Sequence, residues 1–241
     1  MQVSIVIPVY NEGENILLTL EEIDKIKKYA EITILICYDF DDDNTLSSIN
    51  SSKFKNILNI IYVKNTGVSG PHAAVMAGIK YKKKFDYVII LPADDDYNIK
   101  NFPKVFEIIK KENPEIICMS RFIPGGNMEN GPFVKTIIMR IVNFYFKFIG
   151  NLPTSDATNG FRIFSKKTVS NINIKTKKGF TYSLEYLIKG HKKGYKILEF
   201  PALWKERKKG QSRFKIGSWA LEYLKLCLIA IIPNFISKKY F

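Results

Sequence analysis

The sequence of 241 residues contains few of the side chains that form disulfides or soft-metal sites. Its three cysteines, Cys37, Cys118 and Cys227, are far apart and lack metal-binding spacing. We therefore expect free thiols in a reducing compartment and no disulfide framework. The two histidines, His72 and His191, belong to no common motif, and a capping or surface role accounts for each.

Signatures of several other protein classes are also missing. The first residues enter an apolar, β-branched stretch without the charged region and cleavage site of a secretory signal. No G-x-G-x-x-G motif follows this stretch, so a Rossmann-type dinucleotide site is unsupported. The acidic loop that begins at Asp39 has Asn44 and Asn50 where a calcium-binding EF-hand needs Gly and Glu. We therefore exclude an EF-hand.

Negative charge is scarce relative to positive charge. The chain has 23 Asp and Glu residues against 37 Lys and Arg residues, which gives a formal net charge of +14. Such an excess indicates polyanionic partners, namely nucleic acid, phosphorylated substrates or anionic lipid. The charge alone does not choose among them.

What the sequence does contain is a regular alternation of strand and helix patterns. This rhythm predicts βαβ units and a mainly parallel sheet flanked by helices, as in nucleotide-binding α/β folds. The predicted strands cover residues 3–9, 32–37, 57–63, 87–91 and 116–119, and the clearest predicted helices cover 16–26, 73–81 and 102–112. The turn at 11–14 is predicted to cap the first of these helices.

Three consecutive carboxylates, Asp94, Asp95 and Asp96, follow the apolar strand at 87–91. The carboxyl ends of strands in an open α/β sheet are where ligands bind. Carboxylate oxygens suit a hard divalent cation that also contacts nucleotide phosphates. The other interpretation is a solvated acidic turn that caps the next helix. At the end of the second strand, Asp39 can accept the imino N–H of a uracil or guanine base.

Two apolar segments carry charges that a buried helix rarely holds. Residues 133–149 are rich in aromatic side chains but include Lys135, Arg140 and Lys147, which favours a helix lying at a membrane interface. The segment 219–232 is shorter than the roughly 20 apolar residues that span a bilayer. This tail segment fits either an interfacial helix or a core helix that closes the domain.

A series of short motifs, weak singly but specific in their order, extends along almost the whole chain. The motifs are SIVIPVYNEGENI at 4–16, Asp39, Asp43-Asn44-Thr45, Gly70 with Ala74 and Gly78, Ala93-Asp94-x-Asp96, Ser120-Arg121, DATNGFR at 156–162, Tyr182 to Glu185, Glu199-Phe200-Pro201 and ERKKGQSRFK at 206–215. Together they resemble the inverting, GT-A fold glycosyltransferases of the family that includes dolichyl-phosphate mannose synthase. The last motif is similar to that of polyprenyl-phosphate glycosyltransferases rather than polymer synthases.

The resemblance implies a GT-A fold with a mainly parallel central sheet and C-terminal amphipathic, interfacial helices. It implies a glycosyltransferase domain at 1–215, in which 1–121 binds the nucleotide-sugar and 122–215, with the helix 133–149, binds the acceptor. Residues 216–241 would form a membrane-associating tail.

The resemblance also implies roles for individual residues. The catalytic set is Asp94, Asp96 and Arg207, and the first two would hold Mg²⁺ or Mn²⁺. The nucleotide-sugar set is Pro8, Tyr10, Glu12, Asp39, Gly70, Asp94 and Asp95. The acceptor-phosphate set is Arg121, Lys135, Arg140, Asp156, Arg162, Ser212 and Lys215.

Two departures from the family pattern bear on metal ligation and on recognition of the nucleobase. Tyr38 replaces the first Asp of the acidic pair after the second strand, and Pro92 replaces the first Asp of the metal motif. Metal ligation is therefore expected to fall on Asp94 and Asp96, with Asp95 assisting.

The expected reaction is transfer of a sugar from a UDP- or GDP-linked donor to a polyprenyl phosphate, with inversion. A phosphate acceptor is already an anion and needs no general base. The expected partners are the donor, the lipid phosphate and the anionic cytoplasmic face of a membrane, without nucleic acid, and the tail leaves a membrane-protein partner open. The alternatives are a related transferase acting on a saccharide hydroxyl and, from another class, a basic nucleic-acid-binding protein.

Overall fold

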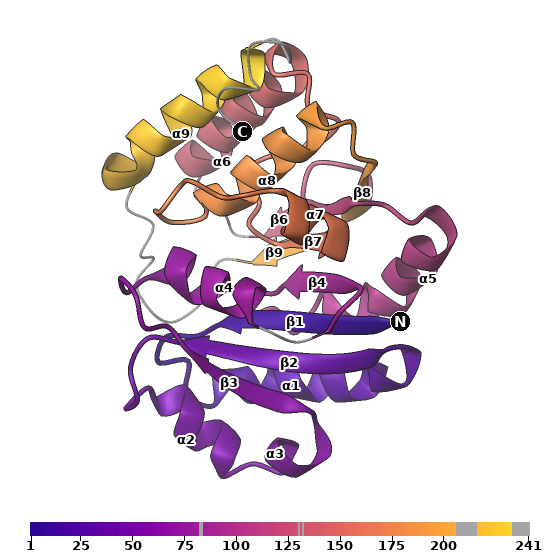
Figure 1. Cartoon of the computed structure of the whole chain (residues 1–241), viewed down its shortest axis with the longest axis vertical. Coiled ribbons are helices and arrows are strands. Elements are labelled where there is room, and N and C mark those ends of the chain that lie inside the picture. Colours follow the sequence, from indigo (N-terminus) through magenta and orange to yellow (C-terminus); the bar gives the residue numbers. More distant parts are fainter. Residues whose placement is uncertain (82–83, 130, 132, 206–215, 233–241) are drawn as a thin grey trace. The chain divides into compact units, whose positions relative to one another are not determined.

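The computed structural model describes residues 1–81, 84–129, 131, 133–205 and 216–232, which form two compact units (Figure 1). The first unit contains Met1–Asn113 together with Ile163–Lys166. The second contains Pro114–Arg162 and the described residues from Lys167 onward. This division begins the second unit eight residues earlier than the predicted boundary after residue 121, because the strand at 116–120 pairs within the second unit.

Within the described residues, the first unit is built on five strands. These are β1 (Gln2–Pro8), β2 (Glu31–Tyr38), β3 (Ile60–Lys64), β4 (Tyr87–Ile90) and β7 (Arg162–Ser165), in the order β3-β2-β1-β4-β7. Of these, β1, β2, β3 and β4 are parallel. β1 pairs with β2 on one side and with β4 on the other, and both pairings are parallel. Most side chains of β1 and β2 and all of those of β4 are buried, as their continuous apolar sequence predicts.

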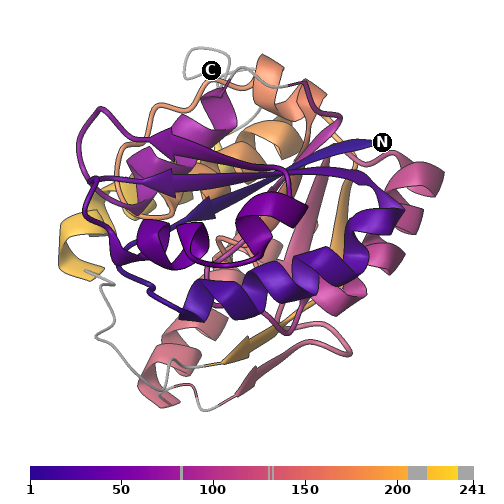
Figure 2. The same ribbon diagram turned by 90° about the horizontal axis from the view of Figure 1, so that it is seen from below.

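Helices cover this sheet. They are α1 (Asn15–Ile26), η1 (Lys27–Tyr29), α2 (Asn44–Asn50), α3 (Phe54–Ile57), α4 (Pro71–Lys80), η2 (Ile99–Asn101) and α5 (Phe102–Glu112). Figure 2 shows α1 running along the strands, and its Ile16, Leu20 and Ile23 are fully buried. α4 packs closely on β1 and β2 because Gly78 has no side chain, and a Cβ there would lie 2.6 Å from the sulfur of Cys37.

The second unit combines short strands with longer helices. Its strands are β5 (Ile116–Ser120) paired with β8 (Ile197–Pro201), and β6 (Asn127–Glu129) paired with β9 (Leu203–Lys205). Its helices are α6 (Phe133–Phe144), the π-helix η3 (Tyr145–Ile149), α7 (Lys166–Asn171), α8 (Thr181–Lys192) and α9 (Ile216–Ile231). α8 is almost wholly buried and forms the core of this unit.

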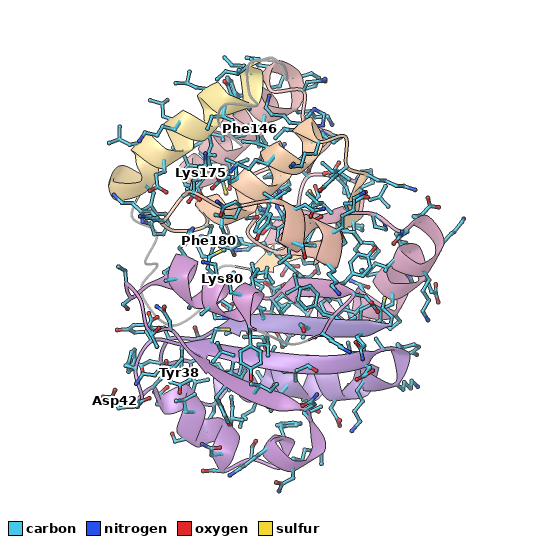
Figure 3. The ribbon with its side chains drawn as sticks, viewed as in Figure 1. Tyr38, Asp42, Lys80, Phe146, Lys175 and Phe180 are labelled. Atoms are coloured by element: carbon cyan, nitrogen blue, oxygen red, sulfur yellow. The ribbon has the colours of Figure 1, made fainter. Side chains whose placement is uncertain are left out.

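α9 is joined by specific contacts to residues 177–180, which lead into α8. The carboxylate of Glu222 accepts hydrogen bonds from the backbone N–H groups of Lys177 and Lys178 at 3.1 and 3.2 Å. The rings of Phe180 and Trp219 meet edge to face at 6.2 Å, and Figure 3 labels Phe180 in this unit. The described part of the predicted tail is therefore an integral helix of the second unit, not a separate segment.

The predicted fold class, a mainly parallel α/β sheet flanked by helices, is confirmed, and the helix at 102–112 has the predicted bounds. The predicted strand at 57–63 begins three residues later in the structure: residues 54–57 form α3, whose first N–H bonds to Ser52, and β3 begins at Ile60. A short apolar run such as 57–61 fits a helix or a strand equally well. Within the described residues, no helix is both long and apolar enough to cross a membrane.

Candidate functional site

The carboxyl edge of the first unit holds most of the predicted nucleotide-sugar residues. The strand order reverses at β1, because β2 and β3 lie on one side of it and β4 on the other. In open α/β sheets, ligands bind beyond the carboxyl ends of the strands at such a reversal. Pro8 ends β1 opposite Cys37, so Tyr10 and Asp39 lie two residues beyond paired positions of adjacent strands.

The loop after β1 is held by the start of α2. The N–H of Asn11 bonds to both carboxylate oxygens of Asp43 at 3.1 Å, and the N–H of Glu12 bonds to the hydroxyl of Thr45 at 3.0 Å. Asp43 also accepts the N–H of Thr45 and so caps α2. This loop was predicted to cap α1, but Glu14 is the N-cap of α1 and makes no side-chain cap bond. The loop instead fixes Glu12 and the preceding Tyr10 at the edge.

Asp39 organises the loop that follows β3. Its Oδ1 accepts the side-chain amide of Asn65 at 2.8 Å. Its Oδ2 accepts the hydroxyl of Ser69 at 2.6 Å and the N–H of Gly70 at 2.8 Å. Gly70 has φ +135°, a conformation that L side chains rarely adopt, and it begins α4. The two predicted nucleotide-binding residues Asp39 and Gly70 are thus brought together.

Aromatic side chains lie beside Asp39. The rings of Tyr10 and Phe40 meet edge to face with 5.1 Å between their centroids, and Tyr10 is 40% exposed. Figure 3 shows Tyr38 and Asp42 in the same region, where β2 ends. Tyr38 stands where the family that the sequence resembles has an acidic residue, so an aromatic side chain precedes Asp39 at the end of β2.

The three aspartates after β4 differ in orientation. Asp95 is buried, and its carboxylate accepts the N–H of Asn98 at 2.9 Å and the side-chain amide of Asn98 at 2.7 Å. Burial raises the pKa of Asp95 to about 7. Asp94 and Asp96 are partly exposed. Asp95 therefore closes the turn, whereas its two neighbours reach the surface.

The described residues contain no group of three or more His, Cys, Asp or Glu side chains placed to hold a metal ion. The pair Asp94 and Asp96 nevertheless fits a hard divalent cation in its chemistry, because such an ion commonly binds one or two carboxylates and takes further oxygens from substrate phosphates. An assisting role for Asp95 fits poorly, since its carboxylate is engaged inside the turn.

In the second unit, Arg121 and Asp156 form a buried ion pair. The Nε and Nη2 atoms of Arg121 bond to the two carboxylate oxygens of Asp156 at 2.7 and 2.8 Å. Asp156 also accepts the backbone N–H of Arg121 at 3.0 Å, and Thr158 and Asn143 complete the cluster. Asp156 is fully buried and Arg121 is 7% exposed. The pair holds the loop after β5 against the loop at 156–162.

Arg162 is also buried, with no exposed surface. Its guanidinium donates to the backbone carbonyls of Asn159, Ala157, Asp156 and Ser183. The prediction that Arg162 grips the acceptor phosphate does not match this geometry, because the group is turned inward to hold the loop. We therefore treat Arg162 as a positioning residue.

The other predicted acceptor residues fall into two groups. Arg140 on α6 is exposed, and its guanidinium lies 5.4 Å from the ring centroid of Phe122, while that of Arg121 lies 5.3 Å from the same ring. Lys135 belongs to α6, but its side chain lies outside the described part. The remaining predicted residues, Arg207, Ser212 and Lys215, are outside the described residues.

The helices α6, η3 and α9 leave a large apolar surface exposed within the second unit. The exposed side chains are Phe133, Ile137, Ile138, Ile141, Phe144, Phe148 and Ile149 from α6 and η3, and Leu221, Leu224, Leu228 and Ile231 from α9. The hydroxyl of Tyr145 donates to the carbonyl of Cys227 at 2.9 Å, which ties η3 to α9. The opposite side of α9 buries Leu226 and Ala230. One face of α9 therefore packs in the core of the second unit, and its other face is apolar and exposed. The first face fits the interpretation of the tail as a core helix, and the second leaves room for the interfacial interpretation.

Two asparagines that belong to none of the sequence motifs also shape these sites. Asn65 fixes Asp39, and Asn143 donates or accepts hydrogen bonds at Asp156, Ala157 and Thr158. Asn65 follows a strand directly, which is a recognisable signal, but Asn143 lies in an apolar helix and only its polarity distinguished it.

Comparison with known proteins supplies the context for this geometry. The family described as glycosyl transferase family 2 matches residues 4–172. The chain is 30% identical over 229 residues to a dolichol-phosphate mannosyltransferase of Pyrococcus furiosus, covering 93% of this chain and 62% of that protein. It thus spans less than two thirds of this relative's length. It is 21% identical to a polyprenol monophosphomannose synthase of Mycolicibacterium smegmatis, covering 90% of this chain and 86% of that one.

Among solved structures, a glucosyl-3-phosphoglycerate synthase of Mycobacterium tuberculosis has a similar fold. The TM-score is 0.69 at 13% identity, over 96% of this chain and 79% of that chain. That enzyme was crystallised with Mn²⁺, uridine diphosphate and phosphoglyceric acid. At this identity the likeness concerns the fold alone.

Proposed function

The chain belongs to glycosyl transferase family 2, and from this premise we propose that it moves a sugar from a nucleoside diphosphate to a polyprenyl phosphate, with inversion. The observation that carries the proposal is the pair of partly exposed aspartates, Asp94 and Asp96, where β4 ends beside the reversal of strand order. Relatives named for transfer to dolichol phosphate and for polyprenol monophosphomannose synthesis support the choice of acceptor.

The first unit would bind the donor. Tyr10, Glu12 and Asp39 would contact the nucleoside, since each follows the carboxyl end of β1 or β2. Pro8 and Gly70 would let the backbone approach the ligand closely, because neither presents a long side chain. Asp95 would contribute by holding the acidic turn in shape rather than by direct contact.

Asp94 and Asp96 would hold Mg²⁺ or Mn²⁺, both of which accept carboxylate and phosphate oxygens. A bound divalent cation supplies neutralisation of the negative charge that develops on the departing diphosphate. Arg207, outside the described residues, is proposed as a second positive charge for the same group.

The second unit would bind the acceptor phosphate. Arg140 is the described cation best suited to contact it directly, because its guanidinium is exposed. Arg121, Asp156 and Arg162 would position the surrounding loops, since all three are buried and hydrogen-bonded. Lys135, Ser212 and Lys215 remain proposed acceptor contacts.

The environment of Asp156 favours a phosphate over a hydroxyl acceptor. A hydroxyl must lose a proton to a general base, whereas a phosphate monoester is already negative at neutral pH. Asp156 cannot readily serve as that base, because its carboxylate is fully buried and engaged by Arg121. This geometry and the names of the relatives together favour lipid-phosphate glycosylation over the saccharide-hydroxyl alternative, and the family assignment argues against a nucleic-acid-binding protein.

A transfer assay tests the proposal. The full chain is incubated with radiolabelled UDP- and GDP-sugars, undecaprenyl phosphate or an oligosaccharide acceptor, and Mn²⁺ or Mg²⁺. We expect a chloroform-soluble product only with the lipid phosphate, and none from the double variant D94A/D96A. The control D41N changes an exposed carboxylate near the same edge and should retain activity. A failure of every donor, or full activity of D94A/D96A, would refute the proposal.

We further propose that α6, η3 and α9 lie on the anionic cytoplasmic face of a membrane. Their exposed apolar side chains are interspersed with the exposed cations Arg140, Lys147 and Lys225, the combination typical of interfacial helices. Flotation with vesicles containing anionic phospholipid tests this directly. L224K on α9 should weaken binding, and L18K on α1, an equally exposed leucine of the first unit, should not. Equal effects of the two substitutions would contradict the assignment.

A further inference from the structure

The ring of Phe122 contacts two guanidinium groups. The guanidinium carbon of Arg121 lies 5.3 Å from the centroid of this ring, and that of Arg140 lies 5.4 Å from it. An aromatic face attracts a cation at such distances, because the ring quadrupole is negative on its face. The residue is itself anchored, since the N–H of Phe122 donates to the hydroxyl of Ser120, a buried residue at the end of β5. Phe122 therefore joins the loop after β5 to α6.

The two arginines that share this ring differ in their other partners. Arg121 is buried, and Asp156 accepts its side-chain hydrogen bonds and balances its charge. Arg140 is exposed, and in the part of the chain that the structure describes no carboxylate forms an ion pair with it. Its charge is not balanced within that part, so an anion from outside the protein can pair with it.

Arg140 also lies in an apolar surface. On α6, Ile137 is three residues before it and Phe144 is four residues after it, so the three side chains share one side of the helix. Both apolar side chains are exposed, as is that of the neighbouring Ile141. The guanidinium thus meets solvent among hydrocarbon side chains. This arrangement suits an acceptor that carries its phosphate on a hydrocarbon chain.

An aromatic ring suits such a cation better than a carboxylate would. A carboxylate partner would accept the N–H groups of Arg140 and neutralise its charge before a phosphate could bind. The ring attracts the guanidinium through its face and leaves the fork of N–H donors available for bidentate contact with a phosphate. The contact also restricts the conformations of the long side chain, so less conformational entropy is lost when the anion binds.

We propose that Phe122 is a positioning residue, whose ring holds the guanidinium of Arg140 in place for the phosphate group of the acceptor. The inference rests on the proposed function, because it takes Arg140 to contact that phosphate. The buried pair of Arg121 and Asp156 is the fixed support. Arg121 contacts the ring, and its Nη1 donates to the sulfur of Met139, the residue before Arg140, at 3.6 Å.

Steady-state kinetics of the full chain with undecaprenyl phosphate, and with the sugar nucleotide that the transfer assay identifies, test the inference. F122L removes the ring but keeps an apolar side chain. We expect its KM for undecaprenyl phosphate to rise about two- to fivefold, the factor that corresponds to about 0.5–1 kcal/mol. Its kcat and its KM for the donor should change by less than about twofold, because only acceptor binding is weakened. F122Y keeps the aromatic face and should restore the KM.

A double-mutant cycle separates positioning from simple packing. R140A should raise the same KM, and F122L should raise it no further in the R140A background, because the ring then has no cation to orient. Y195L is the matched control. The ring of Tyr195 contacts the ammonium of Lys167 at 4.9 Å in the same unit, and its loss should leave both KM values unchanged.

An unchanged KM for undecaprenyl phosphate in F122L would overturn the inference while leaving the proposed function intact. Equal effects of F122L in the unmodified chain and in R140A would do the same, as would a rise in KM that F122Y does not reverse. If the unmodified chain transfers no sugar to undecaprenyl phosphate, the proposed function fails and the inference fails with it.

Discussion

Replacing Asp156 with alanine should destabilise the protein strongly. The side chain is fully buried and accepts hydrogen bonds from the backbone N–H, Nε and Nη2 of Arg121 and from Thr158 and Asn143. The variant would leave the guanidinium of Arg121 buried without its counter-charge, which typically costs about 3–5 kcal/mol. In a protein of this size, each kcal/mol lowers the melting temperature by about 2–4 °C. We therefore expect a decrease of roughly 6–20 °C.

Calorimetry and urea titration followed by circular dichroism measure this change. The double variant R121M/D156A should recover much of the loss, because it removes both buried charges together. D41A, which breaks an exposed ion pair with Lys64, should leave the melting temperature nearly unchanged. A free energy of unfolding of D156A within about 1 kcal/mol of the unmodified protein would contradict this role of the ion pair. So would a loss in R121M/D156A equal to the sum of the losses in D156A and in the single variant R121M.

Three further outcomes are expected. G78A should lose about 1–3 kcal/mol of unfolding free energy in a urea titration, because its Cβ would lie 2.6 Å from the sulfur of Cys37 and 2.7 Å from Cγ1 of Val6; an unaltered midpoint would contradict this packing. E185Q should cost about 3 kcal/mol at neutral pH by leaving Lys189 buried without its partner. Burial raises the pKa of Glu185, but Lys189 and two backbone N–H groups outweigh burial and lower the pKa in the folded protein. The stabilisation by Glu185 is therefore present above the pKa of the unfolded chain and is lost as the pH falls through the pKa of the folded protein. If E185Q and the unmodified protein still differ in unfolding free energy in acid, this role of Glu185 is contradicted. Removal of divalent cations with EDTA should abolish most of the rise in melting temperature produced by UDP, and an undiminished rise would argue against metal-assisted donor binding.

The fold class and the acidic edge of the sheet could be predicted from the sequence because they depend on local patterns. Buried strands read as continuous apolar runs, as at 87–91, and α5 has an apolar face with a Pro near its start and an αL Asn113 after its end. The position of Asp94 to Asp96 after such a strand placed them at a sheet edge. The start of β3 could not be predicted in this way, because the short apolar run before it shows neither the two-residue period of a strand nor the 3.6-residue period of a helix.

The orientation of side chains could not be predicted in the same way. Asp94, Asp95 and Asp96 are chemically identical in the sequence, yet only Asp95 turns inward to Asn98. Arg162 looked like a ligand-binding cation, but the surrounding carbonyl groups enclose it. Burial and hydrogen bonding of a polar group depend on neighbours that the local sequence does not identify.

The sequence by itself therefore determined the parallel α/β architecture, the acidic edge and the excess of positive charge, since each follows from residue type and short-range spacing. Only the tertiary structure decided which carboxylates are available. Arg121 meets Asp156 across 35 positions, and Asp39 meets Gly70 across 31. Such contacts form when distant segments pack together, and this packing engages both carboxylate oxygens of Asp39 and of Asp156 in hydrogen bonds.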